Sequence, residues 1–145
     1  MMGPHGVHLL CMVAMSWLAP HEQTPERYAT CHEVGMAADL TTIPPDLAVA
    51  LAYTESRFRH DAVSSVGARG PFQIVPRFHC PNRTHEGCDL VAEGLSALKR
   101  YRTRYKRWRE VLCHWNSGNR CYRRSKAFAR IVLRRRRNLT RALGD

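Results

Sequence analysis

The chain has 145 residues, a length that fits one domain and leaves no room for several independently folded units. Its formal net charge of +11 is uneven, because residues 1–98 carry 6 Lys/Arg against 10 Asp/Glu and residues 99–145 carry 17 against 2. The basic C-terminal third favours a polyanion such as nucleic acid, anionic lipid or an acidic cell wall. The alternative is a solvated face that only keeps the protein soluble.

A mostly apolar segment, residues 7–19, lies near the N-terminus. It is too short to span a bilayer but suits the central region of a secretory signal. Small residues at positions 14–16 offer a cleavage site, although no Lys or Arg precedes the segment. We therefore expect residues 1–19 to be a leader that is removed on export. A short apolar helix that stays in the domain is the alternative.

Two helices are predicted before a central loop region. A Thr-Pro pair, typical of a helix N-terminus, opens the first helix over residues 25–40. The second helix begins after the prolines of a turn and reaches Glu55. Scattered glycine, proline and polar residues over 57–79 then predict a loop with a short strand or hairpin.

From Asp89 onward the pattern is helical. Apolar and aromatic residues recur every three or four positions and predict a stripe that faces the core: Leu95, Leu98, Tyr101, Tyr105, Trp108, Leu112 and Trp115. The basic residues between them are expected to face water. A last helix over 125–133 precedes a basic tail, residues 134–145, which opens with four arginines. Residues 20–133 are thus expected to form one mainly helical domain.

Glu55 is the candidate catalytic acid. Leu47, Leu51 and Glu55 fall at positions i, i+4 and i+8, so they share one face of the predicted helix. A carboxylate on an apolar face loses solvation, which raises its pKa and keeps it protonated near neutrality. A protonated carboxylic acid is what a glycosidic oxygen needs before its bond can break. An ordinary ion pair with nearby arginines is the alternative interpretation.

Three sequence blocks surround this acid. Residues 55–58 read ESRF, residues 64–76 read SSVGARGPFQIVP, and residues 115–118 read WNSG. In order, residue type and spacing, these blocks resemble the lytic transglycosylases of the lysozyme superfamily, which cleave bacterial peptidoglycan. The resemblance extends over about residues 28–133. It implies a mainly α, lysozyme-like (α+β) fold with a small loop or hairpin region beside an active-site cleft.

The resemblance also implies a reaction. In this family one Glu protonates the leaving oxygen of the MurNAc-(1,4)-GlcNAc bond, and its carboxylate then withdraws the proton of the C6 hydroxyl of the same sugar. The product carries a 1,6-anhydro-MurNAc end. By motif position, Glu55 is the acid and base, and Ser64 would contact the N-acetyl group. The other residues implied to bind sugar are Gly67, Gly70, Gln73, Trp115 and Asn116. Neither a cofactor nor a metal is implied.

The chain departs from the family pattern at two positions. Trp115 stands where the family usually has Tyr, and it can still pack or stack on sugar. Phe128 stands near the place of a later family Tyr that hydrogen-bonds the catalytic Glu. Tyr122 or Tyr53 could take over that hydrogen bond.

Three alternative functions compete with a transglycosylase. A hydrolytic muramidase would use Asp61 as a second carboxylate. A wall-binding or assembly protein would hold glycan in the cleft with weak catalysis. Nucleic-acid binding through the arginine-rich end is the most generic alternative, and it leaves the motif around Glu55 unexplained, so nucleic acid is not expected as a partner.

The six cysteines predict disulfides: Cys11, Cys31, Cys80, Cys88, Cys113 and Cys121. The last four form two pairs with the same eight-residue separation, and two local bridges are the preferred pairing in an oxidising compartment. Loss of a leader would remove the first cysteine and leave Cys31 free or exchanged into one of the bridges. A zinc site with the neighbouring His79, His85 and His114 is the rival, but no Cys-x2-Cys pair is present.

The location and partners follow from the resemblance. We expect an exported, periplasmic or extracellular monomer that acts on peptidoglycan glycan strands and has no integral membrane span. Small stand-alone members of the family accompany secretion systems, conjugation machinery and phage particles, so such an assembly is a further expected partner.

Overall fold

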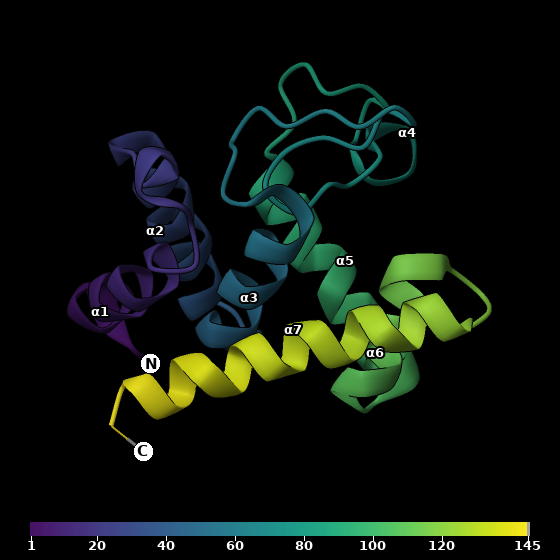
Figure 1. The fold of residues 1–145 in the computed structure, drawn as a ribbon. Helices are drawn as coiled ribbons and strands as arrows, with labels where there is room; N and C mark the ends of the chain where they lie inside the picture. The colour runs from purple at the N-terminus through teal and green to yellow at the C-terminus, as the bar shows by residue number, and fades with distance from the viewer. Residues whose placement is uncertain (145) are drawn as a thin grey trace.

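The computed structural model describes residues 1–144 and contains seven α-helices and one short 3-10 helix in that range. The mainly α fold predicted from the sequence is therefore confirmed (Figure 1). In chain order the elements are α1 (Gly3–Met15), η1 (Pro20–Glu22), α2 (Pro25–Asp39), α3 (Pro45–Ser56), α4 (Pro76–His79), α5 (Leu90–Tyr105), α6 (Trp108–Ser117) and α7 (Arg123–Ala142). Within the same range no helix is both long and apolar enough to cross a membrane.

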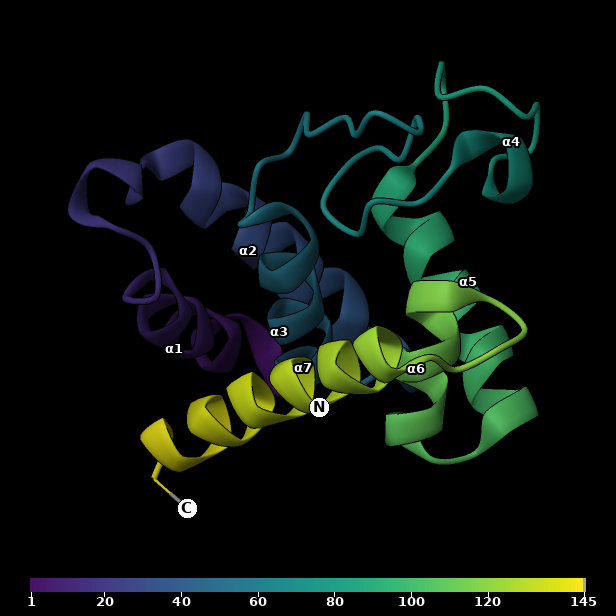
Figure 2. The ribbon, with the colours of Figure 1, turned by 45° about the vertical axis from the view of Figure 1, so that its right-hand side comes forward.

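Helix α3 lies at the centre of the molecule. Every residue from Leu47 to Tyr53 is buried, because α1, α2 and α7 all pack against this helix. Figure 2 shows α1 and α2 on one side of it, α5 and α6 on the other, and α7 running along one face of the molecule. The helix begins at Pro45 and ends where Arg57 adopts a left-handed conformation, with φ of 54°. Glu55 therefore lies in the last turn, where the helix leaves the core.

The loop region that follows α3 packs on the first turns of α5. Only isolated β-bridges, Val63 with Arg69 and Arg69 with Ile74, stand where a short strand or hairpin was predicted. Phe72 is fully buried, and a Cβ added at Gly94 of α5 would lie 2.6 Å from its ring. Glycine at that position therefore lets the loop lie close to α5, which fixes the loop beside Glu55.

The helical pattern after Asp89 is split into two helices. Lys106, with φ of 72°, ends α5, and α6 turns back against it. Because of this turn, Trp115 of α6 packs edge-on against Tyr101 of α5, with ring centroids 6.0 Å apart. The basic residues between the apolar positions are exposed, as predicted: Lys99, Arg100, Arg102, Arg107 and Arg109.

The last helix extends beyond its predicted end at residue 133. Helix α7 continues through the arginine run to Ala142, because its second half also packs on the core. Leu139 is fully buried, and the guanidinium of Arg136 lies 3.1 Å from the carboxylate of Asp46 in α3. Of the four arginines, only Arg134 and Arg137 are exposed. The basic segment is thus a docked helix with an exposed charged side.

The N-terminal apolar segment forms α1, which packs in the core. Val7, Leu10 and Cys11 have no exposed surface. A Cβ added at Gly35 of α2 would lie 2.6 Å from a methyl group of Val7, so glycine permits the close approach of the two helices. The structure therefore contains the retained apolar helix that was the alternative to a leader. Removal of residues 1–19 on export stays a prediction.

All six cysteines form disulfides. Cys80 is bonded to Cys88 and Cys113 to Cys121, the pairing that the spacing predicts. Cys31, expected to be free or exchanged, is instead bonded to Cys11, which links α2 to α1. The packing of α1 explains this difference, because it brings the two Cα atoms to 5.9 Å. In the described part of the chain, no group of three or more His, Cys, Asp or Glu residues is placed to hold a metal ion.

Candidate active site

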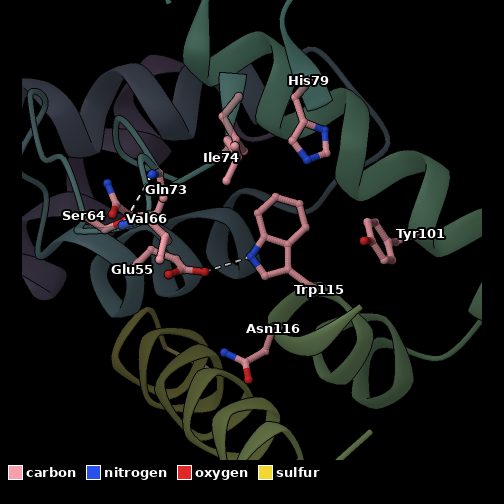
Figure 3. Close-up of a pocket in the computed structure, with 11 residues that line it drawn as sticks. Glu55, Ser64, Val66, Gln73, Ile74, His79, Tyr101, Trp115 and Asn116 are labelled. Carbon is pink, nitrogen blue, oxygen red and sulfur yellow. Dashed lines mark hydrogen bonds between the residues drawn. The ribbon is translucent and has the colours of Figure 1, made fainter. Parts of the chain in front are cut away.

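Glu55 lines a pocket of about 350 Å³ between the end of α3, the loop region and α6. Its volume lies within the range typical of small-molecule and sugar sites. Ser64 and Gln73 line it from the loop, and Trp115 and Asn116 from α6 (Figure 3). The structure therefore brings together five of the residues that the sequence predicted for the site, from segments up to 61 positions apart.

The carboxyl group of Glu55 is tuned by two opposing effects. Burial raises its pKa, and the hydrogen bond donated by Trp115 partly offsets that rise; together the two effects bring the pKa from 4.5 to about 7. The indole Nε1 lies 2.9 Å from the carboxylate Oε2. Near neutral pH the group is thus divided between its acid and its charged form. A residue with a pKa close to the working pH can both give and accept a proton.

Trp115 has a second role that the sequence did not suggest. It was expected to pack or stack on sugar, but its N–H group is the hydrogen-bond donor that holds Glu55. Phe128 is half-buried and has no hydroxyl, and the hydroxyl of Tyr53 donates to the carbonyl of Trp17 instead, at 3.1 Å. Tyr122 is 47 % exposed. Of Phe, Trp and Tyr, only Trp and Tyr carry a hydrogen-bond donor on the ring. A Trp at the family's Tyr position was therefore the sequence signal for this hydrogen bond.

Ser64 and Gln73 hold the loop that borders the pocket. The Ser64 Oγ accepts hydrogen bonds from the backbone N–H groups of Val66 and Ala68, at 3.3 and 3.1 Å. The Gln73 amide donates to the carbonyls of Ala62 and Gly70, at 3.0 and 3.1 Å. Their contact with sugar stays a prediction, whereas their part in shaping the loop follows directly from these bonds.

The two glycines have structural requirements of their own, and their contact with glycan stays a prediction. Gly70 is buried with φ of 80°, and a Cβ there would lie 2.9 Å from Leu90 of α5. Glycine is therefore required at this position by the left-handed backbone and by the close packing on α5. Gly70 does not line the pocket of Glu55. Gly67 also has a positive φ, 84°, but open space surrounds it, and it borders a neighbouring hollow.

His79 and Tyr101 line the pocket and were missed as site residues. His79 was considered only as a zinc ligand, and Tyr101 only as part of the core stripe. Burial, with the charge of Arg100, lowers the pKa of His79, so its imidazole is neutral at pH 7. Its Nδ1 is buried and has no hydrogen-bond partner within residues 1–144. Figure 3 shows its ring over Trp115, on the pocket wall opposite Glu55.

Asp61, the candidate second carboxylate, lies outside the pocket. Its side chain is 99 % exposed and lies 3.1 Å from the Nδ1 of His60. Among residues 1–144, Glu55 is the only carboxylate that lines the pocket. A hydrolysis that needs two carboxylates across one bond is therefore not supported by this geometry.

The raised pKa of Glu55 gives a testable effect on stability. The folded state holds the proton up to about pH 7, whereas the unfolded chain loses it near 4.5, so folding stability falls as pH rises between these values. The Gln side chain of the Glu55→Gln variant does not titrate, so the variant does not lose stability in this way. We expect it to raise the free energy of unfolding by about 3 kcal/mol above pH 7 and by little near pH 4. Urea unfolding of both proteins at pH 4 and 8 measures this, and equal differences at the two pH values would contradict it.

The pocket has one carboxylic acid, Glu55, and it lies in a mainly helical domain; the comparison with known families identifies the class of protein. The model of the Transglycosylase SLT domain family matches residues 33–132. The match spans more than half of the chain and includes the pocket from Glu55 to Asn116. The chain therefore belongs to this family, whose enzymes act on peptidoglycan. Comparisons with curated proteins and with solved structures found no match.

Proposed function

We propose that the protein is a peptidoglycan lytic transglycosylase that cleaves the MurNAc-(1,4)-GlcNAc bond and leaves 1,6-anhydro-MurNAc ends. The observation that carries this proposal is the solitary Glu55 in its pocket, with a pKa near 7. One group with that pKa can serve as acid in the first step and as base in the second. Family membership supports the substrate class.

The proposed reaction needs only this carboxyl group and the substrate. Protonated Glu55 gives its proton to the glycosidic oxygen, and the bond from that oxygen to C1 breaks. The resulting carboxylate takes the proton of the C6 hydroxyl of the same sugar, and the hydroxyl oxygen bonds to C1. The proton count closes, because Glu55 ends as the acid with which it began. The Trp115 N–H group would stabilise the carboxylate between the two steps.

The other pocket residues are proposed to position the sugar. Asn116 is exposed, and Figure 3 shows its amide beside the pocket, where it is free to bind a polar group of the glycan. Ser64 and Gln73 are proposed to contact the sugar from the loop, as an addition to the bonds that hold the loop. The neutral imidazole of His79 and the ring of Tyr101 form the opposite wall.

The products of wall digestion test the proposed reaction. We expect soluble fragments from purified sacculi to carry anhydro ends, which are lighter by one water than reducing ends. Mass spectrometry of the fragments measures this directly. Asp61→Asn is the control variant and should leave both rate and products unchanged, because Asp61 lies outside the pocket. Reducing ends, together with loss of activity in Asp61→Asn, would establish a muramidase instead.

Export is part of the same proposal. Disulfides such as Cys80–Cys88 and Cys113–Cys121, which do not depend on residues 1–19, are typical of an oxidising compartment. The proposed substrate also lies outside the cytoplasm. We propose a periplasmic or extracellular monomer that opens the wall locally for a secretion, conjugation or phage assembly. A leader within residues 1–19 remains a prediction that the mass of the exported protein would test.

A further inference from the structure

A second hollow, of about 580 Å³, lies beside the pocket of Glu55. We call it the side pocket; residues 66–67, 75–78 and 83–86 line it. Val66 and Val75 line both hollows, so the two are adjacent and share a wall at these side chains. A polymer bound with its reacting bond at Glu55 would therefore have a neighbouring part close to the side pocket.

The walls of the side pocket are cationic and partly apolar. Arg77 and Arg83 are both exposed, and neither takes part in an ion pair within residues 1–144. The one acid in the lining, Glu86, lies 3.6 Å from His85. Phe78 is 69 % exposed, and the guanidinium carbon of Arg77 is 5.2 Å from its ring centroid. The hollow thus combines free guanidinium groups with an aromatic surface.

A covalent bond holds these walls in place. The side pocket is built from α4 and the loop that follows it, and the Cys80–Cys88 disulfide closes that loop at its neck. Arg83 has φ of 63°, a left-handed conformation in a turn inside the closed loop. The disulfide restricts how far the loop can move from α4, so it helps to keep both Arg83 and Arg77 in the lining of the hollow.

We propose that the side pocket binds the carboxylates of the peptide that peptidoglycan carries on its MurNAc residues. This inference rests on the proposed function, which supplies the substrate. The peptide branches from the glycan next to the bond that is cut, and it contains free carboxylates. Guanidinium groups bind carboxylates through paired hydrogen bonds, and an exposed aromatic ring covers the apolar parts of such a peptide. Charge complementarity and adjacency to the pocket of Glu55 both favour this occupant.

Binding measurements with two forms of the glycan test the proposal. One form carries its peptides, and in the other an amidase has removed them. In the double variant Arg77→Gln/Arg83→Gln, we expect the affinity ratio of peptide-bearing to peptide-free fragments to fall about tenfold relative to wild type. The loss should shrink as salt rises, because the contacts are charged and exposed. The matched control is Arg120→Gln/Arg123→Gln, two exposed arginines outside both pockets, which should keep the wild-type ratio.

Two outcomes would overturn peptide recognition. An equal loss of affinity for both forms would assign the side pocket to the glycan. Unchanged affinities for both forms would mean that the side pocket binds neither the peptide nor the glycan. Wall cleavage by the wild type is measured in parallel. Binding that follows the expected ratio without any cleavage would overturn the proposed reaction and leave the side pocket as a peptide-recognition site. Thermal unfolding of both double variants checks that they fold like wild type.

Discussion

Replacing Glu55 by Gln should abolish cleavage of the cell wall while the fold stays intact. The amide has nearly the same shape as the acid, and it can still accept the hydrogen bond from Trp115, but it cannot give a proton to the glycosidic oxygen. Loss of an acid/base residue typically lowers the rate about 10²- to 10⁴-fold, which corresponds to roughly 3–5 kcal/mol of barrier. Turbidity loss of purified sacculi, with quantified soluble products, measures the rate.

The matched control for this prediction is Asp61→Asn, the same chemical change at a carboxylate that is 99 % exposed. It should cleave at the wild-type rate. Circular dichroism and unfolding of the Gln variant show whether it is folded, and the stability gain expected above pH 7 gives a second check. A folded Glu55→Gln protein that still cleaves at the wild-type rate would remove Glu55 from the mechanism.

Replacing Cys11 and Cys31 together by Ser should lower the free energy of unfolding by about 3 kcal/mol. The bond closes a 20-residue separation, and its loss restores conformational freedom mainly to the unfolded chain. Both cysteines are fully buried between α1 and α2, so two hydroxyl groups would also be left in an apolar environment. Urea unfolding of the full chain under non-reducing conditions measures the change.

The Cys80→Ser/Cys88→Ser variant is the control, because its loop is shorter and lies at the surface, and its effect should be smaller. Equal stability of the Cys11/Cys31 variant and wild type would mean that this bond does not stabilise the fold. If the exported protein proves to lack residues 1–19, it has lost Cys11 and cannot contain this bond. The mass of the exported protein decides between a retained helix and a leader.

The sequence by itself determined the features that depend on neighbouring residues. The helices around residues 25–39 and 45–56 follow from N-terminal prolines and short-range patterns, and they agree with the structure to within a residue. The two disulfides that span eight positions follow from local loop closure. The position of Glu55 at the end of an apolar helix was also readable, because a helix places i, i+4 and i+8 on one face.

Only the tertiary structure decided the features that join distant segments. The hydrogen bond from Trp115 to Glu55 connects residues 60 positions apart, and it exists because α6 turns back at Lys106. The pairing of Cys11 with Cys31 and the extension of α7 past residue 133 arise in the same way, from packing against the central α3 and its neighbours. The pKa of Glu55 near 7 belongs to this group as well. Desolvation depends on which elements exclude water from the carboxyl group. Helix periodicity can place that group on one face of α3, but it does not reveal the loop and the helix that cover it.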